Sequence, residues 1–182
     1  MKKRNTYRLL YLMLIVAFIG PIQAQDLHFS QFYANPLSLN PAMTAYMGGD
    51  HRAHVNYKNQ WQSISNPYRT LGISYDRHFL RDKLGGNWVG GGIQIINDVA
   101  GTSKWSNLKL SLSASYILSI AENTYLSTGM QFGVIQRSFS MNDLYFDSQI
   151  LPSGVNTSLP SNENISDYSN SALDIGFGAL VG

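Results

Sequence analysis

The chain has 182 residues, of which 13% are charged, 44% are apolar and 12% are aromatic, and it contains no cysteine. Because the charged fraction is about half the roughly 25% usual in soluble domains and aromatic residues are abundant, an intrinsically disordered chain is excluded. The absence of cysteine excludes a disulfide scaffold, a thiolate metal site, a cysteine nucleophile and a lipid-modified N-terminal cysteine, and the length suits one domain.

Residues 1–24 are predicted to be a cleaved secretory signal peptide. Four basic residues precede an apolar run of 11 residues, Leu9 to Ile19, in the order that a signal peptide requires. The run is shorter than the about 20 apolar residues of a transmembrane helix, and cleavage is expected after Ala24. Removing the signal takes the 13 Lys and Arg to 9 against 11 Asp and Glu, a net charge of −2. A nucleic-acid partner is therefore not expected.

Residues 25–50 are predicted to form an extended N-terminal arm interrupted by turns. Pro36 and Pro41 fix their own φ angles and disfavour the helical region for the preceding residues, Asn35 and Asn40. The aromatic side chains of the arm then need a surface to cover them.

Five strands and the beginning of a sixth are predicted from apolar residues that recur at every second position. The best example is Trp105 to Ile120, where leucines alternate with serines and other polar residues. Only residues 121–123 separate it from the next strand, which is short enough for a tight hairpin. The side chains of this strand that are predicted to face lipid are Leu108, Leu110, Leu112, Ala114, Tyr116 and Leu118. The other apolar faces run from Ala53 to Trp61, Leu71 to Tyr75, Val89 to Ile95, Leu126 to Val134 and Leu173 to Val181.

The predicted fold class is all-β: a transmembrane antiparallel outer-membrane β-barrel over residues 51–182, with a soluble β-sandwich as the alternative. Both folds have one wet face, so alternation alone does not separate them. The strands are longer than the five or six residues usual in soluble sheets, their polar faces carry Ser, Gly, Asn and Gln rather than charges, and a long external loop is expected at about residues 140–170. Aromatic residues near strand ends are predicted to form interfacial girdles: Tyr57, Trp61, Tyr68, Tyr75, Trp88, Trp105, Tyr116 and Tyr125.

The predicted strands are too few to close a barrel. Bacterial single-chain barrels use an even number of strands from eight upwards, and an open edge in lipid leaves backbone groups unpaired. The alternating pattern still runs at Gly182, so the sequence is expected to be the N-terminal part of a longer barrel.

The facing of the Trp105 to Ile120 strand can be tested with two substitutions. Leu112→Arg places a charge on the predicted lipid face and should cost about 2–4 kcal/mol near the membrane midplane. Ser113→Arg should be tolerated much better if the opposite face borders a wet lumen.

No catalytic, cofactor-binding or metal site is predicted, and the chain is not expected to be an enzyme. His51 and His54 are three residues apart, which places them on opposite faces of a strand, and no carboxylate cluster accompanies them. Residues 90–92 are consecutive glycines without the spacing of a phosphate-binding loop; glycine in a strand instead indicates a kink, a bulge or a close backbone approach. The acidic residues of the long loop lack the spacing of a calcium loop. No cofactor or small-molecule substrate is identified.

Three segments resemble the PorP/SprF family, outer-membrane barrels associated with type IX secretion and gliding motility. They are Gln25 to Ala42, Asn142 to Gln149 and Leu173 to Gly178, and they follow one another in the family's order. Family members are typically much longer than this chain. The N-terminal motif contains His28, Phe29, Ser30, Gln31, Phe32, Tyr33, Asn35, Pro36, Asn40 and Pro41, and the loop motif contains Asn142, Asp143, Leu144, Tyr145, Phe146 and Asp147.

The resemblance implies an integral outer-membrane component of the type IX secretion system that assists secretion or surface display of cargo proteins such as gliding adhesins. Its implied partners are outer-membrane lipid, type IX secretion components and secreted surface proteins. The arm would plug the barrel lumen, dock a periplasmic partner or pack only against the periplasmic rim. Two other functions stay open: an outer-membrane diffusion channel or hydrophobic-solute transporter, and a soluble β-sandwich with an adhesive role.

Overall fold

The computed structural model describes residues 32–63, 66–101, 104–141, 144–152, 154–156, 158–161, 163 and 166–182. Within this part of the chain, no helix is long and apolar enough to cross a membrane. The predicted signal peptide lies outside the described residues, as do His28, Phe29, Ser30 and Gln31 of the N-terminal motif and Asn142 and Asp143 of the loop motif.

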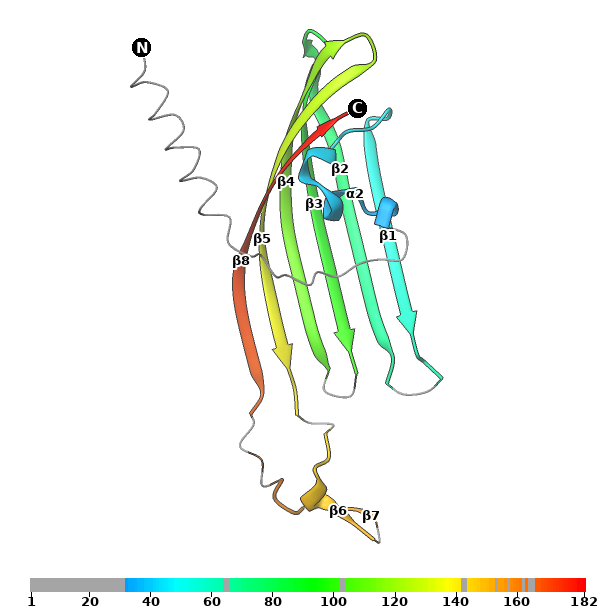
Figure 1. Cartoon of the computed structure of the whole chain (residues 1–182), viewed down its shortest axis with the longest axis vertical. Coiled ribbons are helices and arrows are strands. Elements are labelled where there is room, and N and C mark those ends of the chain that lie inside the picture. The colour runs from blue at the N-terminus through cyan, green and yellow to red at the C-terminus, as the bar shows by residue number, and fades with distance from the viewer. Residues whose placement is uncertain are drawn as a thin grey trace, which may run out of the picture.

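Six long strands form one sheet in the order β1-β2-β3-β4-β5-β8 (Figure 1). All five neighbouring pairs are antiparallel, so the predicted antiparallel all-β fold is confirmed. The described sheet is open, with β1 and β8 at its edges. The strands are β1 His51–Gln60, β2 Tyr68–Leu84, β3 Asn87–Ala100, β4 Trp105–Ala121, β5 Thr124–Phe139 and β8 Tyr168–Val181.

Short and long connections alternate along the sheet. The β2–β3 turn is the pair Gly85 and Gly86, with φ angles of 60° and 93°, which glycine adopts without steric cost and which suit a two-residue hairpin. The β4–β5 turn is Glu122 and Asn123, with Asn123 at a φ of 65°. We call the end with these two turns the short-turn end.

The opposite end, which we call the long-loop end, carries the connections at residues 61–67, 101–104 and 140–167. The last of these is the predicted long loop. It holds the 3-10 helix η3 (Asp147–Gln149) and a small hairpin of β6 (Ile150–Leu151) and β7 (Gly154–Val155), which lies beyond the sheet in Figure 1.

One face of the sheet, which we call the outer face, is apolar and exposed. On β4, Leu112 is 60% exposed, whereas its neighbours Ser111 and Ser113 on the opposite face are 3% and 8% exposed. All six side chains predicted to face lipid on this strand lie together on the outer face. Leu108 to Leu118 spans about 33 Å along the strand, or about 25 Å across a membrane at a tilt of about 40°, which matches the apolar band of outer-membrane barrels. Contact with lipid itself stays a prediction.

The outer apolar face extends over all six strands. Polar residues bound it at the long-loop end, where Gln136 and Ser171 lie opposite each other on β5 and β8. Its other members are Val55 and Tyr57 of β1, Leu71, Ile73 and Tyr75 of β2, Ile93 and Ile95 of β3, Met130, Phe132 and Val134 of β5, and Leu173, Ile175, Phe177 and Val181 of β8.

The N-terminal arm packs against the opposite face of the curved sheet, which we call the inner face (Figure 1). It consists of three short helical turns: η1 (Phe32–Ala34), α2 (Pro36–Leu39) and η2 (Pro41–Met43). The prediction of an extended arm is therefore wrong for these residues, because proline at the first position of a turn is already set for helix. Asn35 and Asn40 are non-helical as predicted, with φ/ψ of −137°/69° and −157°/123°.

The core lies between the arm and the inner face, and much of it is polar. It contains the apolar side chains Leu37, Ala42, Ala45, Trp88, Ile96 and Ile117 and the polar side chains Asn35, Thr44, Thr70, Ser74, Asp76, Gln94, Ser111, Ser113, Ser115, Ser127 and Gln131.

The predicted interfacial role is wrong for Trp105 and Tyr125, whose side chains lie on the inner face, and for Trp88. Its side chain is only 4% exposed and shares the inner face with its register partner Ile117, which is fully buried. The sequence placed this residue near a strand end but did not show that the arm covers it.

Candidate functional site

The candidate functional site is the contact between residues 34–46 of the arm and the inner face of the sheet. Short helical turns leave backbone carbonyl groups without helical partners, and strand side chains donate hydrogen bonds to them. Because the donors come from four different strands, they fix one position of the arm. Ser127 donates to Ala42 at 2.6 Å, Ser115 to Thr44 at 2.5 Å, Arg52 to Met43 at 2.8 Å and to Tyr46 at 3.4 Å, Trp88 to Ala45 at 3.1 Å, and Asn56 to Ala34 at 3.2 Å.

Glycines of the inner face let the arm backbone approach the sheet closely. A Cβ atom at Gly129 would lie 2.4 Å from the carbonyl carbon of Pro41 and 2.5 Å from the nitrogen of Ala42. A Cβ atom at Gly90 would lie 2.6 Å from the carbonyl oxygen of Thr44. These separations are too short for any side chain, so the strand glycines serve the close backbone approach that was one interpretation of their presence.

A buried ion pair joins the sheet to the arm. Arg52 and Asp76 are register partners on β1 and β2, and the guanidinium contacts both carboxylate oxygens, at 3.0 Å from Nε to Oδ1 and 2.6 Å from Nη2 to Oδ2. Asp76 is fully buried, and its Oδ2 also accepts the backbone N–H of Ala45 at 2.7 Å. Since Arg52 also donates to the arm, the pair contacts the arm through both members.

Two asparagines of the N-terminal motif make specific contacts with the sheet. The Asn35 side chain accepts a hydrogen bond from Gln94 Nε2 at 2.6 Å and donates to Ser38 at 2.7 Å. The Asn40 side chain donates to the carbonyl oxygen of Ala179 on β8 at 3.1 Å and accepts from the Ala42 backbone at 2.9 Å. Both Asn-Pro pairs of the motif therefore position the arm.

Three aromatic rings pack against one another where the arm lies at the short-turn end of the sheet. Tyr125 contacts Trp88 edge-on with ring centroids 5.3 Å apart, and it contacts Tyr46 of the arm at 6.4 Å. The Arg81 guanidinium lies 4.8 Å from the Trp88 ring centroid, an attractive cation–π geometry. The cluster covers the point where the arm turns towards β1.

The inner face beneath the arm is not open to water, which changes one prediction. Ser113 is buried, and its Oγ and the Leu37 side chain lie within 3 Å of a Cβ placed at Gly92. The expected tolerance of Ser113→Arg rested on a wet lumen at this position and is wrong, since an arginine side chain there would meet the arm.

Several buried polar atoms at this contact have no hydrogen-bond partner among the described residues. Buried polar groups of this kind are commonly satisfied by ordered water. They are Thr44 Oγ1, Ser74 Oγ, Gln94 Oε1, Ser113 Oγ and Gln131 Nε2.

Other residues considered in the sequence lie away from the arm. His51 is on the outer face, where Nδ1 lies 2.7 Å from the Tyr75 hydroxyl, and His54 is on the inner face, so the two do not converge. Leu144, Tyr145, Phe146 and Asp147 of the loop motif lie in the long loop. In the described part of the chain, no group of three or more His, Cys, Asp or Glu side chains is placed to hold a metal ion.

The sequence did not identify Arg52, Asp76 or Gln94 as parts of the site. The available signal was the composition of the inner face. Small or uncharged polar residues stand at positions 72, 74, 90, 92, 94, 111, 113 and 115, and Asp76 continues the alternation that begins with Gly72 and Ser74. Such a face suits either a lumen or a packed backbone, and the pattern does not distinguish them.

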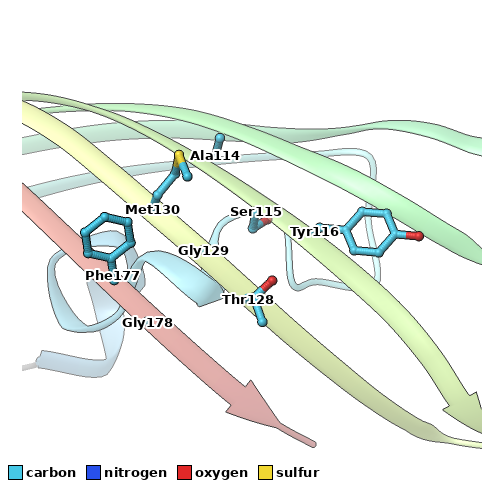
Figure 2. Close-up of a pocket in the computed structure, with 8 residues that line it drawn as sticks. All are labelled: Ala114, Ser115, Tyr116, Thr128, Gly129, Met130, Phe177 and Gly178. Carbon is cyan, nitrogen blue, oxygen red and sulfur yellow. The ribbon is translucent and has the colours of Figure 1, made fainter. Parts of the chain in front are cut away.

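The outer face is hollowed beside β4, β5 and β8 by a groove of about 410 Å³. Figure 2 shows Tyr116, Met130 and Phe177 around the groove, with Gly129 and Gly178 at its base. The lining residues carry no charge, in keeping with the apolar outer face.

Comparison with known proteins gives one match. The family described as "Type IX secretion system membrane protein PorP/SprF" matches residues 22–182. No curated protein and no solved structure gives a significant match.

Proposed function

Because the chain belongs to the PorP/SprF family of type IX secretion system membrane proteins, we propose that it is an outer-membrane component that assists the secretion or surface display of cargo proteins such as gliding adhesins. We further propose that it reaches the outer membrane through a cleaved signal peptide and contacts both lipid and type IX secretion components. The family supports this placement, and so does the exposed apolar outer face, since it has the height of an outer-membrane apolar band.

The seated arm is the observation that favours a secretion component over a diffusion channel. It occupies the inner face at the short-turn end, is held by hydrogen bonds from β1, β3, β4 and β5, and contacts β8 through Asn40. A channel needs an unobstructed aqueous lumen, whereas a scaffold gains rigidity from a packed interior. The short-turn end, which the arm approaches, corresponds to the periplasmic side if the usual barrel orientation holds.

The proposal is tested by deleting the gene in its native host and comparing the proteins in the medium, on the cell surface and in the periplasm. We expect specific cargo proteins to accumulate in the periplasm, and the tagged protein to co-purify with type IX secretion components from outer membranes. An unchanged distribution of all secreted proteins, together with ion conductance of the purified protein in planar bilayers, would support the channel instead.

A further inference from the structure

A second cavity lies on the inner face at the long-loop end, away from the arm. It has a volume of about 360 Å³ and is formed by β4, β5 and β8. On β5, six positions separate the lining residue Ile135 from Gly129, against which the arm backbone packs. This is about 20 Å along a strand, and none of residues 34–46 of the arm lines the cavity. Its lining residues are Trp105, Ile135, Arg137, Tyr168, Asn170 and Ala172.

One residue that lines the cavity, Arg137, is positively charged, and no carboxylate of the described residues neutralises it. Arg137 makes no ion pair with the described residues. Asp98 is two strands away in the same register row, and it accepts a hydrogen bond from Thr70. Asp174, on β8, pairs with Lys109 at 2.8 Å. An arginine without a carboxylate partner, in a concave site, is suited to bind an oxyanion through two parallel N–H groups.

The other lining groups suit a compact ring-shaped ligand. Trp105 and Tyr168 are 45% and 53% exposed and border the cavity, and Asn170 adds an amide that both donates and accepts hydrogen bonds. In the register row that joins Arg137 to Asn170, the Asn107 Oδ1 atom is buried without a partner among the described residues. A volume of about 360 Å³ is at the small end of ligand sites.

An extended peptide fits this site less well. Peptides commonly bind to sheets by pairing with an exposed strand edge, and of the three strands that form the cavity only β8 is an edge of the described sheet, because β4 and β5 are each paired on both sides. On β4 and β5, recognition of a ligand therefore depends on the side chains of Trp105, Ile135 and Arg137. We infer that the cavity binds an acidic saccharide, with Arg137 holding the carboxylate and Trp105 and Tyr168 contacting the sugar ring.

The test is calorimetric titration of the detergent-purified full-length protein with D-glucuronate, D-glucose and the acidic dipeptide Glu-Gly. Glucuronate should bind at one site per chain, and glucose at least about tenfold more weakly. Arg137→Gln should weaken glucuronate binding by about tenfold or more, as expected when a charge-assisted hydrogen bond is lost. Arg69→Gln is the matched control, because Arg69 lies on the outer face near the same end of the sheet and should leave binding unchanged.

A second readout is the tryptophan fluorescence change on glucuronate addition, which should disappear in Trp105→Phe. Absence of glucuronate binding to the unmodified protein, or equal binding by Arg137→Gln, overturns the inference. Binding of Glu-Gly as tightly as glucuronate, with the same dependence on Arg137, overturns the saccharide assignment and identifies a peptide site.

Discussion

Adding one methyl group at Gly129 should displace the N-terminal arm from its seat. The Cβ atom of Gly129→Ala would lie 2.4 Å from both the carbon and the oxygen of the Pro41 carbonyl group. These are backbone atoms, which cannot move aside as a flexible side chain does. Overpacking of this kind costs about 1–3 kcal/mol. If the cost falls on the seated state alone, the population of the displaced arm rises about 5- to 150-fold.

The assay uses the absence of cysteine from the chain. Thr44→Cys introduces a single thiol at a fully buried arm position whose hydroxyl has no hydrogen-bond partner among the described residues, so it should perturb the seat little. The rate of maleimide labelling of this cysteine in outer-membrane vesicles then reports how often the arm leaves. In the Gly129→Ala background we expect labelling to be about 5- to 150-fold faster.

Gly176→Ala is the matched control on the neighbouring strand. A Cβ atom there would meet only the Gln131 Cβ, at an ordinary distance of 3.7 Å, so labelling should stay within about twofold of the Thr44→Cys parent. Equal, slow labelling in both alanine variants would refute the argument that close backbone contact at Gly129 seats the arm.

Three further predictions concern stability, measured by urea titration of protein folded into phospholipid bilayers. Asp76→Leu should destabilise the protein by about 3–5 kcal/mol because it leaves Arg52, whose side chain is only 18% exposed, without its partner, whereas the double variant Arg52→Met/Asp76→Leu should lose much less; equal losses would show that the ion pair is not coupled. Leu112→Arg should cost about 2–4 kcal/mol on the lipid side, while Gln60→Arg, at an exposed inner-face position beyond the arm, should change stability by about 0.5 kcal/mol or less; a similar loss in both would contradict the assignment of faces. Gly86→Val should destabilise the β2–β3 hairpin by about 1–2 kcal/mol because Gly86 has a φ of 93°, and Gly48→Val, where a Cβ meets nothing within 4 Å, serves as its control.

The strands and their two faces could be predicted from the sequence because strand periodicity is local. Each side chain on β4 points opposite to its neighbours whatever lies nearby, so the leucines from 108 to 118 share one face in any pairing. The hairpin at residues 121–123 is equally local, since its length alone selects a tight turn.

The conformation of the arm could not be predicted from the local sequence alone. The sequence identified Asn35, Pro36, Asn40 and Pro41 as a motif and predicted the backbone restriction at both asparagines. It did not predict helical turns, because proline is compatible with both an extended arm and the first position of a helix. Contacts with Gln94, Ala179 and Asp76 selected the observed conformation.

The sequence by itself thus determined a long-stranded β protein with one apolar and one polar face. Only the tertiary structure decided that the polar face at the short-turn end is covered by the chain's own N-terminal arm. The physical reason is the separation of the contacting residues: Asn40 and Ala179 are 139 positions apart, and Ser127 and Ala42 are 85 apart. Small polar residues and glycine suit a water-filled lumen and a packed backbone equally well, and the difference depends on which distant segment folds against them.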